Sequence, residues 1–316
     1  MPTKFQFQIE ETIYKNRLDS FLFDEITAVS KMFLRNLIKK DECKINGNLG
    51  IQGGYHLKKG DIVEIEIDLE AETAMKPENI AFEIVFEDEE IIVVNKPAGM
   101  LVHPTFAQKT GTLLNALAFY LNEQNKLRIT NYELREISDV EELRTNDQFK
   151  IRNPKSKIIR PGLVHRLDRE TSGLMVIAKT KRAHKILSDH FGRKLVEKKY
   201  LAVVEGNVEN DDGTINAPIG RFEDEKRWGI KNDGKFSETL YRVLKRFSGK
   251  TLLELEPVTG RTNQLRIHCA YLGHPIIGDK LYKGREYPRL CLHAAKLRFW
   301  HPNGARRMEF ESQISF

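Results

Sequence analysis

The sequence predicts an α+β protein with two domains. At 316 residues and 36.6 kDa the chain is longer than one typical domain. Apolar segments with strand spacing follow one another through turns, with few helical patterns between them, which favours a mixed, mostly antiparallel sheet. Hydrophobic residues make up 40% of the chain, which is enough for a buried core.

The first domain is predicted at residues 14–70. Residues 17–45 have the pattern of two short helices, and residues 60–67 alternate as a half-buried strand. In the second helix an apolar face of Leu34, Leu37 and Ile38 lies beside a stripe of basic residues with helical spacing: Lys31, Arg35 and Lys39. A polar linker that contains Pro77 is predicted at residues 71–80.

The second domain is predicted at residues 81–316. It opens with a hairpin of strands at 82–86 and 91–94. Further strands are predicted at 174–179, 198–205, 237–247, 251–257 and 291–299, and helices at 110–121, 181–195 and 261–272. Residues 122–158 are polar, have little apolar periodicity, and are interpreted as an insertion.

Composition excludes several classes of protein. Cys43, Cys269 and Cys291 have no CxxC spacing and suit a reducing compartment. No Cys/His cluster predicts a metal site, and no phosphate or dinucleotide loop is found, so no cofactor is expected. No run of about 18 apolar residues is present and the N-terminus does not resemble a signal peptide, so we expect a cytoplasmic protein without membrane contact, and a monomer.

Charge is unevenly distributed. Residues 1–75 carry 10 basic and 13 acidic side chains, whereas the remainder carries 41 and 32. A net charge of +9 on the second domain favours a polyanionic partner such as RNA, although only weakly.

The motif most informative about chemistry is the segment Gly162–Gly173, GLVHRLDRETSG, which runs directly into the apolar residues 174–178. It places one acid, Asp168, between Arg166 and Arg169, in a loop that a buried strand would hold rigidly. An ionised carboxylate in such a position can act as a nucleophile or a base without a cofactor.

This motif resembles the segment around the catalytic aspartate of the RluA-type RNA pseudouridine synthases. Three further blocks match the same family in the same order: Asn95–Pro104, Lys198–Tyr200 and Gly260–His268. One departure is Asn263, where the family usually has His. The resemblance implies an α+β catalytic domain of the pseudouridine synthase type and the conversion of uridine to pseudouridine in RNA.

The resemblance also implies roles for individual residues. Asp168 would be the catalytic carboxylate, with Arg266 as the ion-pair partner that keeps it ionised. Tyr200 would stack on the flipped uracil, and Leu265 would close the floor of the pocket. Five further residues are predicted to contact the substrate. Arg166 would fill the space that the flipped base leaves, whereas His165 is expected to order the loop, not to act as an acid or base. Lys96 is either a phosphate contact or a strand-end lysine, and Arg261 and Gln264 belong to the last block.

Residues 14–70 resemble the small RNA-binding module named after ribosomal protein S-four, which presents its second helix and the following turn to RNA. That resemblance implies a set of RNA-binding residues: Lys31, Arg35, Lys39, Lys40, Lys44 and Asn46. Asp41 stands where the module commonly has Gly, and Asp tolerates the left-handed conformation.

Three alternatives from other classes were weighed. The HRLD motif and a strand lysine suggest a protein kinase, but the residue order differs and the other kinase motifs are missing. A glycosidase needs paired carboxylates, and Asp168 with Glu170 gives no reason to face one bond. A non-catalytic RNA-binding assembly factor would lack Asp168, Tyr200 or Arg266. The sequence therefore predicts an RNA pseudouridine synthase acting on large-subunit ribosomal RNA, with transfer RNA as the alternative substrate.

Overall fold

The computed structural model describes residues 3–10, 17–26, 29, 31–67, 76–105, 107–123, 161–224, 227–314 and 316. The predicted insertion lies outside the described residues from position 124 onward, as does the predicted linker as far as position 75. The chain divides into two compact units, Met1–Ile80 with His103–Pro161 and Ala81–Val102 with Gly162–Phe316.

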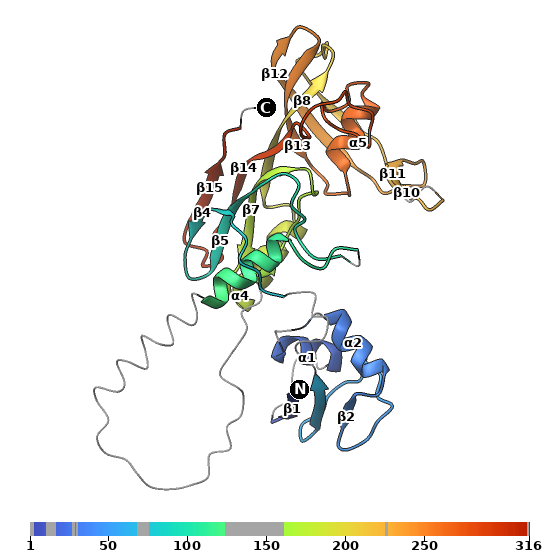
Figure 1. Ribbon diagram of the computed structural model, residues 1–316, viewed down its shortest axis with the longest axis vertical. Helices are drawn as coiled ribbons and strands as arrows, with labels where there is room; N and C mark the ends of the chain where they lie inside the picture. The colour runs from blue at the N-terminus through green and yellow to red at the C-terminus, as the bar shows by residue number, and fades with distance from the viewer. Residues whose placement is uncertain are drawn as a thin grey trace, which may run out of the picture. The chain divides into compact units, whose positions relative to one another are not determined.

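The N-terminal unit contains a three-stranded antiparallel sheet in the order β1-β3-β2 and two short helices (Figure 1). Its elements are β1 (Thr3–Gln8), α1 (Leu18–Glu25), α2 (Lys31–Lys39), β2 (Cys43–Ile45) and β3 (Ile62–Ile67). The two predicted helices and the predicted strand at 60–67 are therefore present. A helix over residues 113–123 corresponds to the one predicted at 110–121.

The core of this unit lies between its helices and its sheet. Leu34 and Ile38 on α2 are buried with Val63 and Ile65 on β3, and Leu37 is buried as well, so the apolar face predicted for the second helix is confirmed. Strand β2 occupies Cys43–Ile45, at the end of the range 17–45 that was predicted as helical, and strand β1 was not predicted either. Its pattern is short, and its partner β3 lies more than 50 residues later in the chain.

The second unit is built on a ten-stranded sheet. Eight strands follow one another in the order β4-β5-β7-β14-β8-β13-β12-β9, with β6 added on β7 and β15 on β14. Their bounds are β4 Glu83–Glu87, β5 Ile91–Lys96, β6 Gly162–Leu163, β7 Ser172–Ala178, β8 Glu197–Glu205, β9 Asp212–Asn216, β12 Glu238–Phe247, β13 Lys250–Pro257, β14 Leu292–Trp300 and β15 Arg307–Glu311. A separate hairpin is formed by β10 (Ile219–Phe222) and β11 (Arg227–Ile230).

The sheet is mixed, as predicted. Strands β7 and β14 pair in parallel, and the other strand pairs among the described residues are antiparallel. Every residue of β7 is buried, which agrees with its continuous apolar sequence. Gly173, the second residue of β7, has a φ of 118°, and a Cβ there would lie 2.4 Å from the backbone oxygen of Ala294. Glycine is therefore required where β7 approaches β14.

The predicted strands of the sheet and the predicted helices are present, with α4 at Lys181–Gly192 and α5 at Gln264–Tyr271. The Thr180 hydroxyl caps α4 by accepting a hydrogen bond from the Ala183 N–H at 3.0 Å. Strands β6, β9, β10, β11 and β15 were not predicted. β9, for example, buries only Ile215, so its sequence carries no apolar alternation.

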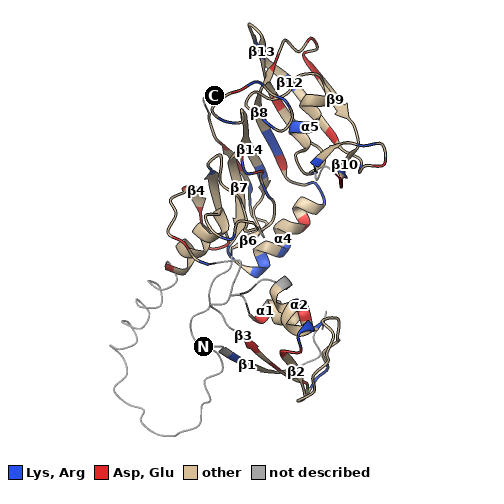
Figure 2. Ribbon diagram, turned by 45° about the vertical axis from the view of Figure 1, so that its right-hand side comes forward, with Lys and Arg blue, Asp and Glu red and all other residues tan. Residues whose placement is uncertain are grey.

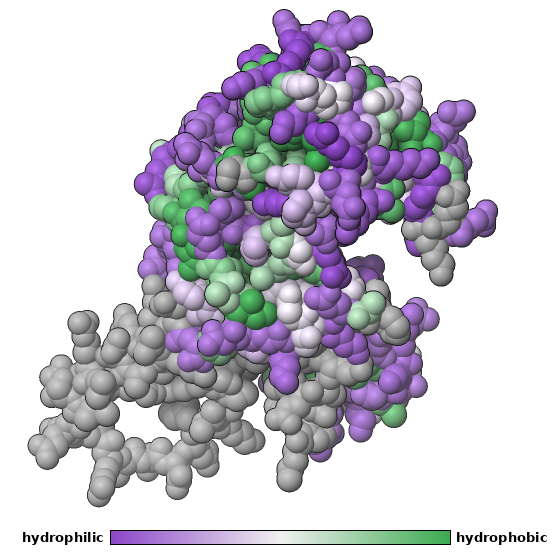
Figure 3. All heavy atoms as spheres, turned by 45° about the horizontal axis from the view of Figure 1, so that its top comes forward, coloured by the Kyte–Doolittle hydropathy of each residue, from purple (hydrophilic) through white to green (hydrophobic). Residues whose placement is uncertain are grey.

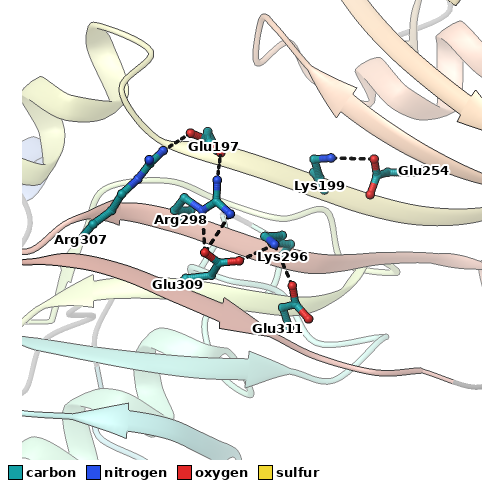
Figure 4. Close-up of polar contacts among 8 residues, drawn as sticks. All are labelled: Glu197, Lys199, Glu254, Lys296, Arg298, Arg307, Glu309 and Glu311. Atoms are coloured by element: carbon teal, nitrogen blue, oxygen red, sulfur yellow. Dashed lines mark hydrogen bonds and ion pairs between the residues drawn. The ribbon is translucent and has the colours of Figure 1, made fainter. Parts of the chain in front are cut away.

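One surface of the sheet carries a network of ion pairs (Figure 4). Arg298 on β14 contacts Glu197 and Glu309 at 2.8 Å, and Lys296 pairs with Glu309 and Glu311. Arg307 pairs with Glu197, and Lys199 on β8 pairs with Glu254 at 2.7 Å. We call these eight residues the sheet network; its positive and negative charges pair with one another.

The described helices include none that is long and apolar enough to cross a membrane. On the face seen in Figure 3, hydrophobic side chains form separate patches among hydrophilic ones. Large apolar side chains that are exposed, such as Leu49, Phe236 and Tyr271, come from different elements of the chain.

Candidate active site

The loop that carries the HRLD motif connects β6 to β7 and is anchored by His165. The His165 Nε2 accepts a hydrogen bond from the Val176 N–H at 3.0 Å, and its ring stacks on Phe191 with centroids 4.6 Å apart. Burial, followed by the charge of Lys198, lowers the pKa of His165 to about 3. The imidazole is therefore neutral at physiological pH and holds the start of the loop against β7 and α4.

Lys96 holds the end of the same loop. Its side chain is fully buried, and its ammonium donates to the carbonyl oxygens of Pro97 and Met100 at 2.8 Å and of Arg169 at 3.0 Å. These three bonds use every donor of a lysine. The predicted phosphate contact of Lys96 is therefore wrong. Its position at the end of β5 agrees with the strand-end alternative, and it ties that strand to the residue after Asp168.

A cavity of about 600 Å³ opens beside this loop. The HRLD loop, β8, the end of β13 and the start of α5 line it. Among the lining residues are eight that the sequence analysis selected: His165, Arg166, Asp168, Tyr200, Arg261, Gln264, Leu265 and Arg266. Blocks that are far apart in the chain thus meet at one cavity of a size suited to a nucleotide-sized ligand.

The Asp168 carboxylate is half-buried at this cavity, and no described residue makes a hydrogen bond or ion pair with it. Burial raises the pKa of Asp168 above its usual value, and the charges of Arg266, Arg166 and Lys96 offset this only in part. We expected a nearby arginine to favour the anion. It does so, but desolvation is the larger effect.

Arg266 does not form the ion pair that was predicted for it. Its Nε and Nη2 donate to the two carboxylate oxygens of Asp279, each at 2.7 Å, and Asp279 is 1% exposed. The sequence interpretation is corrected here, because Asp279 rather than Asp168 is the direct partner. The guanidinium also lies over the Tyr282 ring, 5.2 Å from its centroid, so its position is fixed from two sides.

Tyr200 and Leu265 form apolar walls of the cavity. They are 8% and 7% exposed, and no described residue hydrogen-bonds to the Tyr200 hydroxyl. Burial, followed by the charge of Asp168, raises the pKa of Tyr200, so its phenol is protonated at physiological pH. An aromatic ring that lines the same cavity as a carboxylate can hold a planar base near that carboxylate.

The side-chain amide of Gln264 makes all of its hydrogen bonds within the protein. Its Oε1 accepts from the Thr259 hydroxyl and the Arg261 N–H, and its Nε2 donates to the Glu238 carbonyl and the Thr239 hydroxyl. The predicted substrate contact of Gln264 is therefore corrected to a structural role, because its amide has no donor left. It places the backbone of Arg261, whose exposed guanidinium is tied only at Nε in the described structure.

Comparison with known proteins settles the family. A family model described as RNA pseudouridylate synthase matches residues 90–271, which contain the HRLD loop, β8 and α5. The chain belongs to the RNA pseudouridine synthase family. It is an isomerase that acts on RNA.

Several relatives match this pseudouridine synthase over nearly its whole length. YlyB of Bacillus subtilis (strain 168), an uncharacterized RNA pseudouridine synthase, is 34% identical over 94% of this chain and 90% of its own. Ribosomal large subunit pseudouridine synthase D of Escherichia coli O157:H7 is 32% identical, with coverages of 97% and 91%. The structure of human RNA Pseudouridylate Synthase Domain Containing 1 is similar with a TM-score of 0.55, 27% identity, and coverages of 76% and 86%.

Three residues of the synthase at this site were missed by the sequence analysis. Asp279 and Tyr282 contact Arg266, and Lys198 lines the cavity. Asp279 had a usable signal, since it is an acid that follows the apolar pair Ile276–Ile277 after a single glycine, Gly278. Asn263 bridges the Tyr282 hydroxyl and Arg266 with a φ of 54°, a left-handed conformation that Asn tolerates.

The predicted RNA-binding residues of the N-terminal unit differ in availability. Lys39, Lys40 and Lys44 are exposed, whereas the Lys31 side chain lies outside the described structure. Arg35 donates through Nε to the buried carboxylate of Asp19 at 2.7 Å, so part of its charge is neutralised.

Asn46 contributes to the turn between β2 and β3 rather than to a free surface. Its amide donates to Asp61 and accepts from the Ile62 N–H, so its predicted use as a free RNA ligand is corrected. The described residues contain no group of three or more His, Cys, Asp or Glu side chains arranged to hold a metal ion.

Proposed function

We propose that this pseudouridine synthase modifies uridine in large-subunit ribosomal RNA, with Asp168 as its catalytic carboxylate. The observation that carries the assignment of Asp168 is its half-buried, unpaired carboxylate at the cavity that Tyr200 and Arg266 also line. The proposed target is supported by relatives named as ribosomal large subunit pseudouridine synthases, which match this chain over almost its full length.

The reaction breaks the bond between uracil N1 and the ribose C1′ and joins C1′ to C5 of the same base. N1 gains a proton and C5 loses one, so no oxidant or external water is needed. Asp168 supplies the nucleophile or base while ionised, and the absence of a described hydrogen-bond partner leaves its oxygens accessible to substrate. Tyr200 stacks on the flipped uracil, and Leu265 closes the apolar side of its pocket.

Arg266 serves this chemistry through position and charge. Because Asp279 holds it in a bidentate pair, its guanidinium stays at the cavity wall and its charge lowers the pKa of Asp168. The exposed guanidinium of Arg166 also lowers the pKa of Asp168 from within the loop, and the family resemblance supports a second role in which it enters the space that the flipped base leaves.

The N-terminal unit is proposed to be an RNA-binding module of the ribosomal-protein-S-four type. Its available cations are Lys39 and Lys40 at the end of α2 and Lys44 on β2, all exposed. Each phosphate contact that they make contributes about 0.7–0.9 to the slope of log affinity against log salt concentration. The module would hold a large structured RNA while the cavity carries out the reaction.

The target is tested by mapping pseudouridines in total RNA from cells with and without this gene. We expect a position in large-subunit ribosomal RNA to lose its pseudouridine and to regain it with the wild-type gene, but not with Asp168→Asn. Loss of a transfer RNA position instead would replace the proposed target. If no position changed, the proposed substrate class would be abandoned.

The module is tested with Lys39→Gln, Lys40→Gln and Lys44→Gln combined in the full chain. Binding to large-subunit ribosomal RNA should weaken and its salt slope should fall, whereas the single-turnover rate at saturating RNA should change little. The matched control also removes three cations, each already engaged by an acid: Lys199→Gln, Lys296→Gln and Arg298→Gln. Equal salt slopes for the two variants would leave the N-terminal unit without an RNA-binding role.

A further inference from the structure

Lys198 is a cation of the active-site cavity that the catalytic roles above leave unexplained. It lies on β8 two residues before Tyr200, so the two side chains project from the same face of the strand. Both line the cavity with Asp168. The Lys198 ammonium lies 5.8 Å from the centroid of the Phe191 ring, which stacks in turn on His165 of the HRLD loop.

No acidic side chain among the described residues pairs with Lys198. Its neighbour Lys199 contacts Glu254 at 2.7 Å, although the two lysines are adjacent in sequence. Lys198 is nevertheless half-buried, and burial lowers its pKa without an opposing carboxylate. A cation removed from water without a counter-charge is costly to the folded protein.

The charge of Lys198 is not used to tune the nucleophile either. The cations that lower the pKa of Asp168 are Arg266, Arg166 and Lys96. Lys198 is therefore neither an internal ion pair nor a partner of the catalytic carboxylate, and it remains available to a ligand that enters the cavity.

We propose that Lys198 binds the phosphodiester group adjoining the flipped uridine. This rests on the RNA substrate class of the family. Uracil is neutral and cannot offset a half-buried cation, whereas each RNA phosphate brings one negative charge. Residues two apart on a strand are separated by about 6.5 Å along it, so Tyr200 can face the base while Lys198 faces the sugar–phosphate backbone. Figure 2 marks the Lys and Arg positions along β8 and α4, among which acidic positions also occur.

The test measures RNA affinity across a series of salt concentrations for Lys198→Met and Lys199→Met. Both variants also carry Asp168→Asn, so that binding is read without turnover. The probe is either transcribed large-subunit ribosomal RNA or total transfer RNA, whichever the Asp168→Asn chain binds more tightly. The choice of RNA tests the proposed target, and the difference between the two lysine variants tests the role of Lys198, so one can fail without the other.

We expect Lys198→Met to weaken binding several-fold and to lower the salt slope by about 0.7, the share of one phosphate contact on a single strand. Lys199→Met should retain the slope of its parent, and Lys198→Arg should restore it, because a guanidinium also binds phosphate. Lys198→Gln serves as a second neutral variant if the methionine form does not fold by circular dichroism.

Turnover provides an independent measurement in chains that keep Asp168. Lys198→Met should raise KM for RNA while kcat at saturating RNA stays within about threefold of wild type. An unchanged salt slope in both neutral variants would overturn the proposal. A large loss of single-turnover rate with an unchanged slope would also overturn it, and would place Lys198 on the base instead of the phosphate.

Discussion

Lys198 and Lys199 are neighbours on β8, yet they lie in opposite electrostatic surroundings. Lys199 belongs to the sheet network, in which each charged side chain contacts one of opposite sign (Figure 4). Lys198 faces the cavity, where Asp168 is also without a described partner. The two lysines of β8 therefore differ in that Lys199 is paired within the protein, whereas Lys198 faces a cavity in which it and Asp168 have no described partner, although Glu197 and Arg266 at that cavity are paired.

The difference matters because the two arrangements have different costs. Exposed ion pairs contribute little to stability and lose strength in salt. Unpaired groups at a cavity destabilise the fold, as the raised pKa of Asp168 and the lowered pKa of Lys198 both indicate. Substitutions in the sheet network should therefore change stability slightly and activity hardly at all. Substitutions of the cavity residues should reduce activity strongly.

The largest effect is expected from Asp168→Asn. The amide retains the shape of the side chain but cannot act as a nucleophile, so product formation should fall below about 1% of wild type. Tritium release from uridine-labelled RNA measures this directly. Turnover above that level would mean that another group performs the reaction.

The same variant should be no less stable than wild type at neutral pH. Burial raises the pKa of Asp168 in the folded state, so the ionised form destabilises the fold, and this effect fades as pH falls through the folded pKa. Asp168→Asn should therefore gain stability at pH 7 and lose that gain in acid. Denaturant unfolding of both proteins at pH 7 and in acid measures this difference in stability. A variant less stable than wild type at pH 7 would contradict the expected gain.

Arg266→Met should have the next largest effect, this time on the fold as well. It leaves Asp279 buried without its ion-pair partner, and breaking such a pair costs about 3–5 kcal/mol. Arg266→Lys keeps a charge but loses the bidentate geometry, so its loss should be smaller. Urea unfolding of both variants tests this order, with Arg182→Met, which removes an exposed partner of Glu90, as the control.

The pH dependence of activity should depend on the cavity charges. Asp168 acts when ionised, so the rate should fall about tenfold for each pH unit below its pKa in the enzyme–substrate complex. Arg166 lowers the pKa of Asp168, so Arg166→Met should move the acid limb to higher pH. Single-turnover rates from pH 4 to 8 on one RNA measure the shift. An acid limb at the wild-type pH would show that Arg166 does not act on this carboxylate.

The smallest effect is expected in the sheet network. Arg298→Met removes contacts with Glu197 and Glu309, yet the site is partly solvent-exposed, so stability should change only slightly. The rate of modification should be unchanged within error. A loss of activity without a loss of stability would place the sheet network in substrate binding and remove the contrast between the two faces of β8.

The sequence by itself was sufficient for the reaction class and the framework. The apolar run 174–178 predicted the buried strand β7, because burial on both faces removes polar alternation. Strand patterns separated by turns, with few helices between them, predicted the mixed sheet. The blocks around Asp168, Tyr200 and Arg266 pointed to one family, and the structure places all three residues at one cavity. Local patterns of this kind are set by neighbouring residues, so they can be read from the chain alone.

Only the tertiary structure decided which polar groups are free. Lys96 looked available, but a carbonyl 73 residues away completes its hydrogen bonds. Arg266 was assigned to Asp168, whereas Asp279 holds it. The amide of Gln264 on α5 is hydrogen-bonded to β12 and to the loop before the helix, and Lys198, adjacent to a paired lysine, has no acidic partner among the described residues. Hydrogen-bonding capacity and desolvation depend on segments that meet only in the fold, and local sequence patterns do not record which segments those are.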